Sequence, residues 1–299
     1  MNNKTLIITA FQSFITKNVI NTEIFSILAS QKDWRLILAV PKDKVNFFQE
    51  VYGGPQIIIR GVEVEILNRD RWVKFFSRLF FLIQNSHYLN YKKRERLDND
   101  RTWKGYLRYT REVLGTKILS PLTWLYPVWR WLFLAMVKPR AIASLFNDCQ
   151  PDAIFSTDIF NETDVLIEAE AKRRKLLVIG MVRSWDNCYS KGILRVMPDE
   201  IIVNNDTIRE EIITLHKADS RHVFVGGLPQ FDHFINEPRT PREEFFKQLG
   251  LDPNKKTIVF APAGMILSDT DWQIGEILDQ AIKTGDIKQP TQALIRNHP

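Results

Sequence analysis

Cysteine is scarce in this chain, and the amino terminus lacks a long apolar stretch. Only Cys149 and Cys188 occur among 299 residues, which provides neither a disulfide framework nor the spacing of a metal site. The run Leu6–Ala10 is too short to form the core of a signal peptide. These absences favour a protein of the reducing cytoplasm, and we expect no bound metal.

The sequence also lacks a G-x-G-x-x-G motif, which argues against a classical dinucleotide site. What it does contain is a series of short apolar runs that alternate with helical segments. Strands are predicted over residues 4–10, 34–40, 56–66 (split or bulged near Gly61), 152–156, 176–182, 200–203, 222–225, 257–261 and 293–295. Such alternation predicts an α/β fold with a largely parallel sheet, here built as two Rossmann-like domains.

Positive charge is concentrated in one segment that interrupts this pattern. Between residues 69 and 140 there are 16 lysines and arginines against 5 acidic residues, together with 15 aromatic residues. Apolar residues recur at helical spacing from Trp72 to Ile83, so the segment is predicted to be a helical insert. It could be a packed subdomain, or it could lie on an anionic membrane surface. Nucleic acid suits the charge alone, but no nucleic-acid motif supports it and we expect no such partner.

The stretch Ile118–Val137 is long enough to suggest a membrane span. However, two internal prolines and Arg130 near its middle argue against a clean span, and three tryptophans favour an interfacial or packed position.

We therefore expect a first domain over residues 1–239, with the insert at about 69–140, and the start of a second domain over 240–299. Because a complete Rossmann-like domain needs roughly 100–150 residues, we expect the second domain to be incomplete and the chain to be truncated.

Three predicted strands between Gly180 and Phe234 are each followed by a polar or glycine-bearing loop. In open α/β sheets, sites form at the carboxyl ends of the strands. The first of these loops holds Ser184, Asp186 and Asn187, followed by Ser190 and Lys191. A carboxylate there could act as a general base on a hydroxyl, and a lysine could hold a phosphate. The structural alternative is an Asx-type turn with a solvated lysine.

This segment resembles glycosyltransferases of the GT-B fold, and in particular the CDP-glycerol glycerophosphotransferase-like branch that acts on bacterial surface polymers. Loops of the type S-W-D-N-x-x-S-K-G followed by P-D are matched by Ser184, Trp185, Asp186, Asn187, Ser190, Lys191, Gly192, Pro198 and Asp199. The resemblance implies that Asp186 is a base or acceptor anchor and that Ser184, Asn187, Ser190 and Lys191 are polar groups of the cleft. The segment Gly227–Asp232 resembles the G-x-P-x-x-D step at which such chains cross between domains.

Four further residues are assigned by the same resemblance. The run Arg296-Asn297-His298-Pro299 resembles an R-x-H-P motif, which implies that Arg296 contacts the donor phosphates and that His298 delivers a proton. Gly264 lies in the donor-facing loop, where the family often has Thr or Arg, so only its backbone N–H is expected to take part. Asn18 follows a basic residue, as in an acceptor-cleft loop of related chains.

The resemblance implies transfer of a sugar or glycerol-phosphate unit from a nucleotide-activated donor, of the UDP-sugar or CDP-glycerol type, with no permanently bound cofactor. The expected acceptor is a cell-surface polymer or its lipid-linked precursor, reached through residues 69–140 at the inner face of the cell membrane. Two alternatives stay open: a non-catalytic, membrane-associated binding module and an enzyme similar to sugar-nucleotide epimerases.

Overall fold

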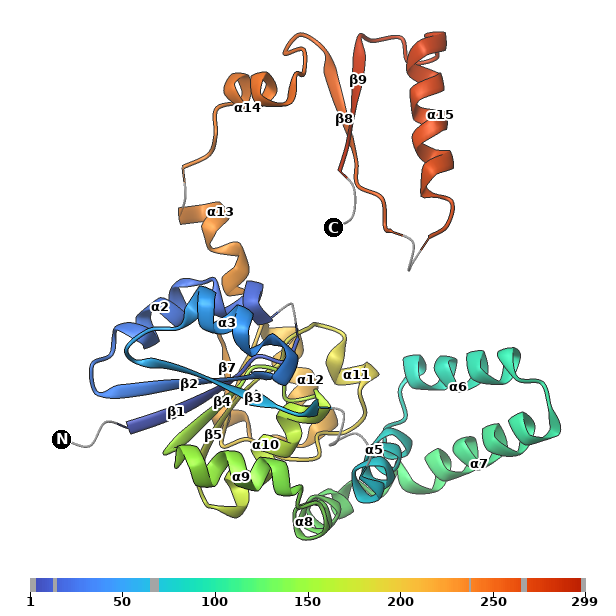
Figure 1. Ribbon diagram of the computed structural model, residues 1–299. Helices are drawn as coiled ribbons and strands as arrows, with labels where there is room; N and C mark the ends of the chain where they lie inside the picture. The colour runs from blue at the N-terminus through green and yellow to red at the C-terminus, as the bar shows by residue number, and fades with distance from the viewer. Residues whose placement is uncertain (1–3, 13–14, 65–69, 237, 265–267, 297–299) are drawn as a thin grey trace. The chain divides into compact units, whose positions relative to one another are not determined.

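Seven parallel strands form one sheet in the computed structural model (Figure 1). The structure describes residues 4–12, 15–64, 70–236, 238–264 and 268–296. Along the sheet the strands stand in the order β3-β2-β1-β4-β5-β6-β7. Their bounds are Lys4–Thr9 (β1), Trp34–Pro41 (β2), Ile57–Val62 (β3), Ala153–Ser156 (β4), Leu177–Met181 (β5), Glu200–Val203 (β6) and Val223–Val225 (β7).

Both faces of this sheet are covered, which explains why its strands are continuous apolar runs. In β1, Ile7 packs into a core cluster that includes residues of helices α5, α8, α9 and α10. The next residue, Ile8, packs into a second cluster with residues of η1, α2 and α3. Successive strand residues point to opposite faces, so each strand contributes to both clusters.

The helices that complete the first half of the sheet are short. They are η1 (Thr16–Ile20), α2 (Glu23–Ser30), η2 (Lys42–Lys44) and α3 (Val45–Tyr52). The strand predicted over residues 56–66 is one strand that ends at Val62, and its predicted second part was wrong at residues 63 and 64. Val62 pairs with Pro41, the last residue of β2. β2 ends at Pro41, so the ladder between β2 and β3 also ends there.

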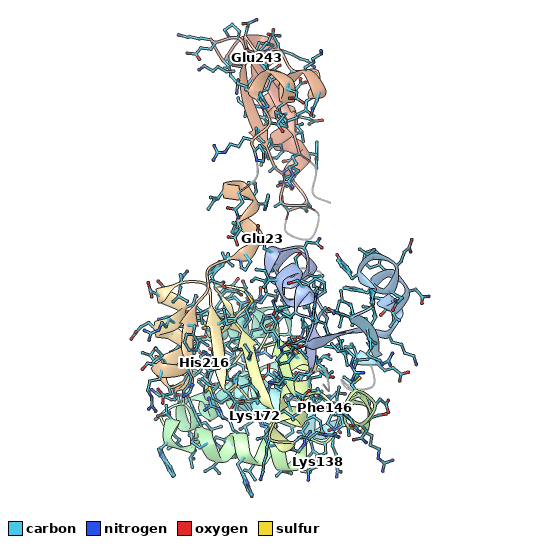
Figure 2. All side chains as sticks on the ribbon, turned by 90° about the vertical axis from the view of Figure 1, so that its left-hand side faces the viewer. Glu23, Lys138, Phe146, Lys172, His216 and Glu243 are labelled. Carbon is cyan, nitrogen blue, oxygen red and sulfur yellow. The ribbon has the colours of Figure 1, made fainter. Side chains whose placement is uncertain are left out.

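Three longer helices accompany the second half of the sheet: α9 (Arg140–Cys149), α10 (Glu162–Arg173) and α12 (Asp206–His216). The others there are short: α11 (Asn187–Ser190), η4 (Ser220–His222) and η5 (Pro229–Phe231). Asn161 begins α10, because its side chain accepts hydrogen bonds from the backbone N–H groups of Thr163 (3.0 Å) and Asp164 (3.4 Å). Figure 2 places Phe146 of α9 within the body of this unit, where it is fully buried.

The basic, aromatic segment is helical, as predicted. Its elements are α5 (Arg71–Ile83), α6 (His87–Asn99), α7 (Trp103–Leu119), η3 (Thr123–Leu125) and α8 (Tyr126–Met136). In Figure 1, α6 and α7 form a hairpin beside α5. Phe76 of α5 and Phe133 of α8 meet edge to face, with ring centroids 5.5 Å apart, and both belong to the main core. The stretch Ile118–Val137 is broken by η3, and no helix in the described ranges is long and apolar enough to cross a membrane.

The chain divides into two compact units, Met1–Asp232 and His233–Pro299. The second unit holds α13 (His233–Asn236), α14 (Arg242–Leu249), β8 (Lys256–Phe260), α15 (Asp271–Thr284) and β9 (Thr291–Ile295). Its two strands pair in parallel, from Lys256 opposite Thr291 to Phe260 opposite Ile295. The predicted α/β class is thus confirmed: a parallel sheet in the first unit, with a helical insert, and a short parallel pair in the second.

Candidate functional site

The direction in which successive strands are added to the sheet reverses between β1 and β4, which are parallel neighbours. The chain builds outward from β1 through β2 to β3, and from β4 through β5 and β6 to β7. In open α/β sheets the crevice at such a switch point, at the carboxyl ends of the strands, is where ligands bind. The two strands are joined there: the backbone N–H of Thr157 donates to Oγ1 of Thr9 (2.9 Å), and Oγ1 of Thr157 donates to the carbonyl of Thr9 (2.7 Å).

Asp158, which follows Thr157, is a buried carboxylate at this point. Only 3% of it is exposed. One oxygen accepts from Nε of Arg183 (2.6 Å), and the other accepts from the backbone N–H of Phe160 (3.2 Å). Burial raises the pKa of Asp158, although the charge and hydrogen bond of Arg183 oppose the rise.

Helix α10 brings two further carboxyl groups beneath the switch point. Asp164 and Glu168, one turn apart, are both fully buried. Oγ1 of Thr9 donates to Asp164, and Oγ of Ser156 donates to Oε1 of Glu168 (2.5 Å). Burial raises the pKa of each well above its ordinary value, which favours the neutral form. The other oxygen of Glu168 has no hydrogen-bond partner among the described residues.

The loop predicted to carry chemistry lies after β5, and its carboxylate is held in place. Asp186 accepts hydrogen bonds from Oγ of Ser184 (2.5 Å) and Oγ of Ser190 (3.1 Å). Burial alone would raise its pKa, but the two hydroxyls and the charge of Lys191 together lower it. Asp186 is therefore an ionised, half-exposed group with fixed neighbours.

Asn187 and Lys191 connect this loop to the switch point. Asn187 is 1% exposed, and its Nδ2 lies 3.5 Å from Oδ1 of Asp158. Lys191 is exposed, and its charge lowers the pKa of both Asp158 and Asp186. The structure thus brings together Ser184, Asp186, Asn187, Ser190 and Lys191, and it adds Asp158 and Arg183 to them.

The loop is supported by residues distant in sequence, and His216 is the most buried of them (Figure 2). Its Nδ1 accepts from the backbone N–H of Leu194 (3.1 Å), and its Nε2 lies 3.1 Å from the carbonyl of Cys188. Since Nδ1 accepts, the proton resides on Nε2, which donates to that carbonyl. Burial, first, and the charge of Arg130 lower the pKa of His216 to about 3.

The helical insert also holds this loop. Arg130 of α8 donates to the carbonyls of Leu194 (3.0 Å) and His216 (2.7 Å). At the end of α5, Nε2 of Gln84 donates to the carbonyl of Cys188 (2.5 Å). Gly192 has a φ of +83°, and a Cβ there would come within 2.8 Å of the carbonyl oxygen of Phe80. The insert is therefore part of the site's framework.

Pro198 and Asp199, which complete the matched loop pattern, serve as structural supports. Asp199 accepts from the backbone N–H of Val178 (2.9 Å) and from Nζ of Lys172 (2.5 Å). A Cβ at Gly180 would come within 2.7 Å of the Pro198 ring, so this strand residue and the proline fit closely. Through these contacts, Pro198 and Asp199 join β5 to the segment that leads into β6.

The remaining predicted residues lie elsewhere. Asn18 is buried in η1, after β1, and its Oδ1 accepts no hydrogen bond from the described part of the chain. Gly264 and Arg296 belong to the second unit: the N–H of Gly264 donates to Oδ2 of Asp271 (2.9 Å), and the N–H of Arg296 donates to the carbonyl of Phe260 (2.9 Å). His298 lies outside the described residues.

Sequence reasoning missed Asp158, Arg183, Asp164 and Glu168. Asp158 could have been found, because it follows the predicted strand over residues 152–156 just as Asp186 follows the next one. Asp164 and Glu168 gave no comparable signal, since acidic residues early in a helix are ordinary. Within the described ranges, no cluster of three or more His, Cys, Asp or Glu residues could hold a metal ion.

No protein-family model and no curated protein matches the sequence. Among solved structures, the chain is similar to a protein assigned as a UDP-N-acetylglucosamine 2-epimerase from Listeria monocytogenes, at 10% identity and a TM-score of 0.49, over 100% of this chain and 64% of that one. It is also similar to a UDP-N-acetylglucosamine 2-epimerase from Rickettsia bellii, at 13% identity and a TM-score of 0.46, over 100% and 63%. A glycosyltransferase from Rickettsia africae is similar at 9% identity and a TM-score of 0.47, over 99% and 69%. The chain spans less than two thirds of the length of the first two.

Proposed function

We propose that this protein transfers a sugar or glycerol-phosphate unit from a nucleotide-activated donor to a hydroxyl of a cell-surface polymer or its lipid-linked precursor. The observation that carries the proposal is the loop after β5, where the Asp186 carboxylate is held between the hydroxyls of Ser184 and Ser190 beside Lys191. This loop lies at the carboxyl edge of a parallel sheet, and its sequence resembles the corresponding motif of the glycerophosphotransferase-like branch.

In the proposed reaction, the acceptor hydroxyl approaches Asp186. The hydroxyl oxygen forms a bond to the transferred unit, the bond between that unit and the nucleotide breaks, and its electron pair leaves with the nucleotide phosphate. Asp186 accepts the hydroxyl proton. Because its pKa is lowered, Asp186 is ionised before the acceptor arrives, so it can accept and orient the hydroxyl from the outset.

Asn187 and Lys191 complete the acceptor side, and the donor side is assigned to the second unit. Lys191 is exposed and carries a charge suited to a phosphate. Arg296 and His298 would contact the donor phosphates, and the N–H of Gly264 would line the same loop. A UDP-sugar and CDP-glycerol are the two donor types to be compared.

The insert would hold the acceptor side at a membrane. Its exposed tryptophans are Trp103 (70%), Trp124 (70%) and Trp131 (65%), while Phe76 and Phe133 are in the core. Indole rings of this exposure, within a segment rich in lysine and arginine, suit the interface of an anionic bilayer. These exposed indoles support a proposed location at the inner face of the cell membrane.

The test is nucleotide release with UDP-N-acetylglucosamine or CDP-glycerol as donor and bacterial membranes as acceptor. Asp186→Asn should lower the acceptor-dependent rate by roughly 10²- to 10⁴-fold, the usual contribution of a general base. Asp148→Asn is the matched control: Asp148 is exposed and lies before β4, at the amino edge of the sheet. Unchanged turnover in Asp186→Asn, with normal unfolding, would contradict the proposal. A change of sugar configuration without acceptor would replace it with an epimerase.

A further inference from the structure

The three helices α5, α6 and α7 enclose a groove of about 750 Å³ that is separate from the loop after β5. Five cations line it, against the single acid Glu112: Arg78 from α5, Arg96 from α6, and Lys104, Arg108 and Arg111 from α7. The positive charges around this hollow repel one another, and a bound anion would relieve that repulsion.

Two of the five cations already have carboxylate partners. Arg96 pairs with Glu112 (3.0 Å), and Arg108 pairs with Asp100 (3.3 Å). The side chains of Arg78, Lys104 and Arg111 make no hydrogen bond or ion pair with the described residues, and all three are exposed. Three cations from two helices thus remain available to a ligand, and the two paired arginines also line the groove.

Three apolar side chains also line the groove: Phe81, Leu82 and Leu107. Leu107 is 49% exposed, and the Arg96 guanidinium lies over the Phe81 ring, 5.4 Å from its centroid. Elsewhere on α7, Trp103 (70%) and Tyr106 (53%) are exposed as well. Cations within a groove bordered by exposed apolar side chains match a phosphate headgroup whose acyl chains continue into a bilayer.

We propose that the groove between α5, α6 and α7 binds the phosphate headgroup of an anionic lipid. Arginine and lysine are suited to this ligand, since guanidinium forks pair with phosphate oxygens in two-point contacts and lysine adds a point charge. The inference deepens the membrane-facing role proposed above and rests on it, but it requires neither donor nor acceptor chemistry. It also gives the insert a defined binding site in addition to its diffuse positive charge.

The experiment measures sedimentation of the full chain with vesicles, in the absence of any nucleotide donor. Phosphatidylcholine vesicles are compared with vesicles that contain phosphatidic acid and with vesicles that contain phosphatidylserine at the same surface charge. The chain should bind the phosphatidic acid vesicles most strongly, because this headgroup presents its phosphate without a substituent. Inorganic pyrophosphate should release the bound chain by competing for the groove.

Two matched double variants separate the groove from general attraction. Arg78→Gln with Arg111→Gln removes one groove cation from α5 and one from α7. Lys74→Gln with Lys117→Gln removes two exposed cations from the same helices outside the groove. If each groove cation contributes what a basic residue near an anionic surface does, its loss weakens binding about fivefold, or about 25-fold for the pair. The control pair should weaken binding less than the groove pair does, because neither lysine lines the groove.

Equal losses in the two double variants would overturn the proposal, as would equal binding to the two anionic lipids. Pyrophosphate binding without vesicle binding would assign the groove to a soluble phosphate instead. Binding of a short RNA duplex in place of vesicles would assign it to nucleic acid. Asp186→Asn should bind vesicles like the wild type. The lipid-binding result can therefore be interpreted even if the proposed transfer reaction is not observed.

Discussion

Lowering the pH from about 7.5 to about 5.5 should destabilise the first unit through His216. This imidazole is fully buried, and it is bound in its neutral form between the N–H of Leu194 and the carbonyl of Cys188. Burial and the neighbouring Arg130 guanidinium lower its pKa from the ordinary 6.5 to about 3. In the unfolded chain the same imidazole is exposed to water and binds a proton readily.

The sign and size follow from these two pKa values. The stability that neutral His216 provides is fully present above pH 6.5 and is lost as the pH falls toward 3, because only the unfolded state binds the proton in that interval. Between about pH 7.5 and about pH 5.5 the loss amounts to about 1.4 kcal/mol. Asp158, Asp164 and Glu168 act in the opposite sense, since their pKa values are raised in the folded state. The effect of His216 must therefore be read as a difference between two proteins.

The assay is urea unfolding followed by tryptophan fluorescence, for the wild type and His216→Gln at both pH values. Glutamine retains an N–H donor but does not titrate. The wild type should lose about 1.4 kcal/mol more than the variant on acidification. Equal pH dependence in the two proteins would refute the reasoning. An NMR titration of the wild type provides a second measurement that does not depend on the variant folding: a His216 resonance that titrates near its ordinary pKa would refute it as well.

Two further predictions concern the loop that Asp186 occupies. Gly192→Ala should lower the free energy of unfolding by about 1 kcal/mol because of the left-handed backbone, and by a further 1–3 kcal/mol, roughly, because its Cβ approaches Phe80. Gly227 has a φ of +75° and open space around it, so Gly227→Ala should show only the backbone contribution in urea unfolding. The idea fails if the two glycine variants are equally stable. Arg130→Met should cost about 3 kcal/mol, because two buried carbonyls each lose a charged donor. Arg94→Met, an exposed change on α6, should stay within about 0.5 kcal/mol, and a similar loss in both arginine variants would contradict the role given to Arg130.

Much of the sheet could be predicted because its signals are local. The run Lys4–Ala10 became β1, Glu200–Val203 became β6 without change, and helix α5 followed the apolar spacing from Trp72 to Ile83. Such segments are determined by side-chain periodicity and by the turn residues beside them. The helix α12 was not predicted, although Asn205 caps it by accepting from the N–H of Ile208 (2.9 Å). An asparagine after a strand was interpreted there only as part of a loop.

In the insert, the helical spacing of aromatic residues could not show which of them are buried in the core and which are exposed. The aromatic residues of α5 and α8 include Phe76, Phe80 and Phe133, which are in the main core, whereas Trp103 of α7 is exposed. All of them belong to one aromatic, basic segment of the sequence. Which of them are covered depends on what lies opposite each helix, and the sheet and α10 cover only some of them.

By itself, the sequence determined the alternation of strands and helices, the polar loop from Ser184 to Lys191 and the concentration of charge between residues 69 and 140. Only the tertiary structure decided that Asp158 and Arg183 join that loop and that Arg130 fixes it from the insert. Arg130 reaches carbonyls 64 and 86 positions further along the chain. Local patterns are set by neighbours within a few residues, whereas such contacts arise only when packing brings distant backbone groups within hydrogen-bond distance.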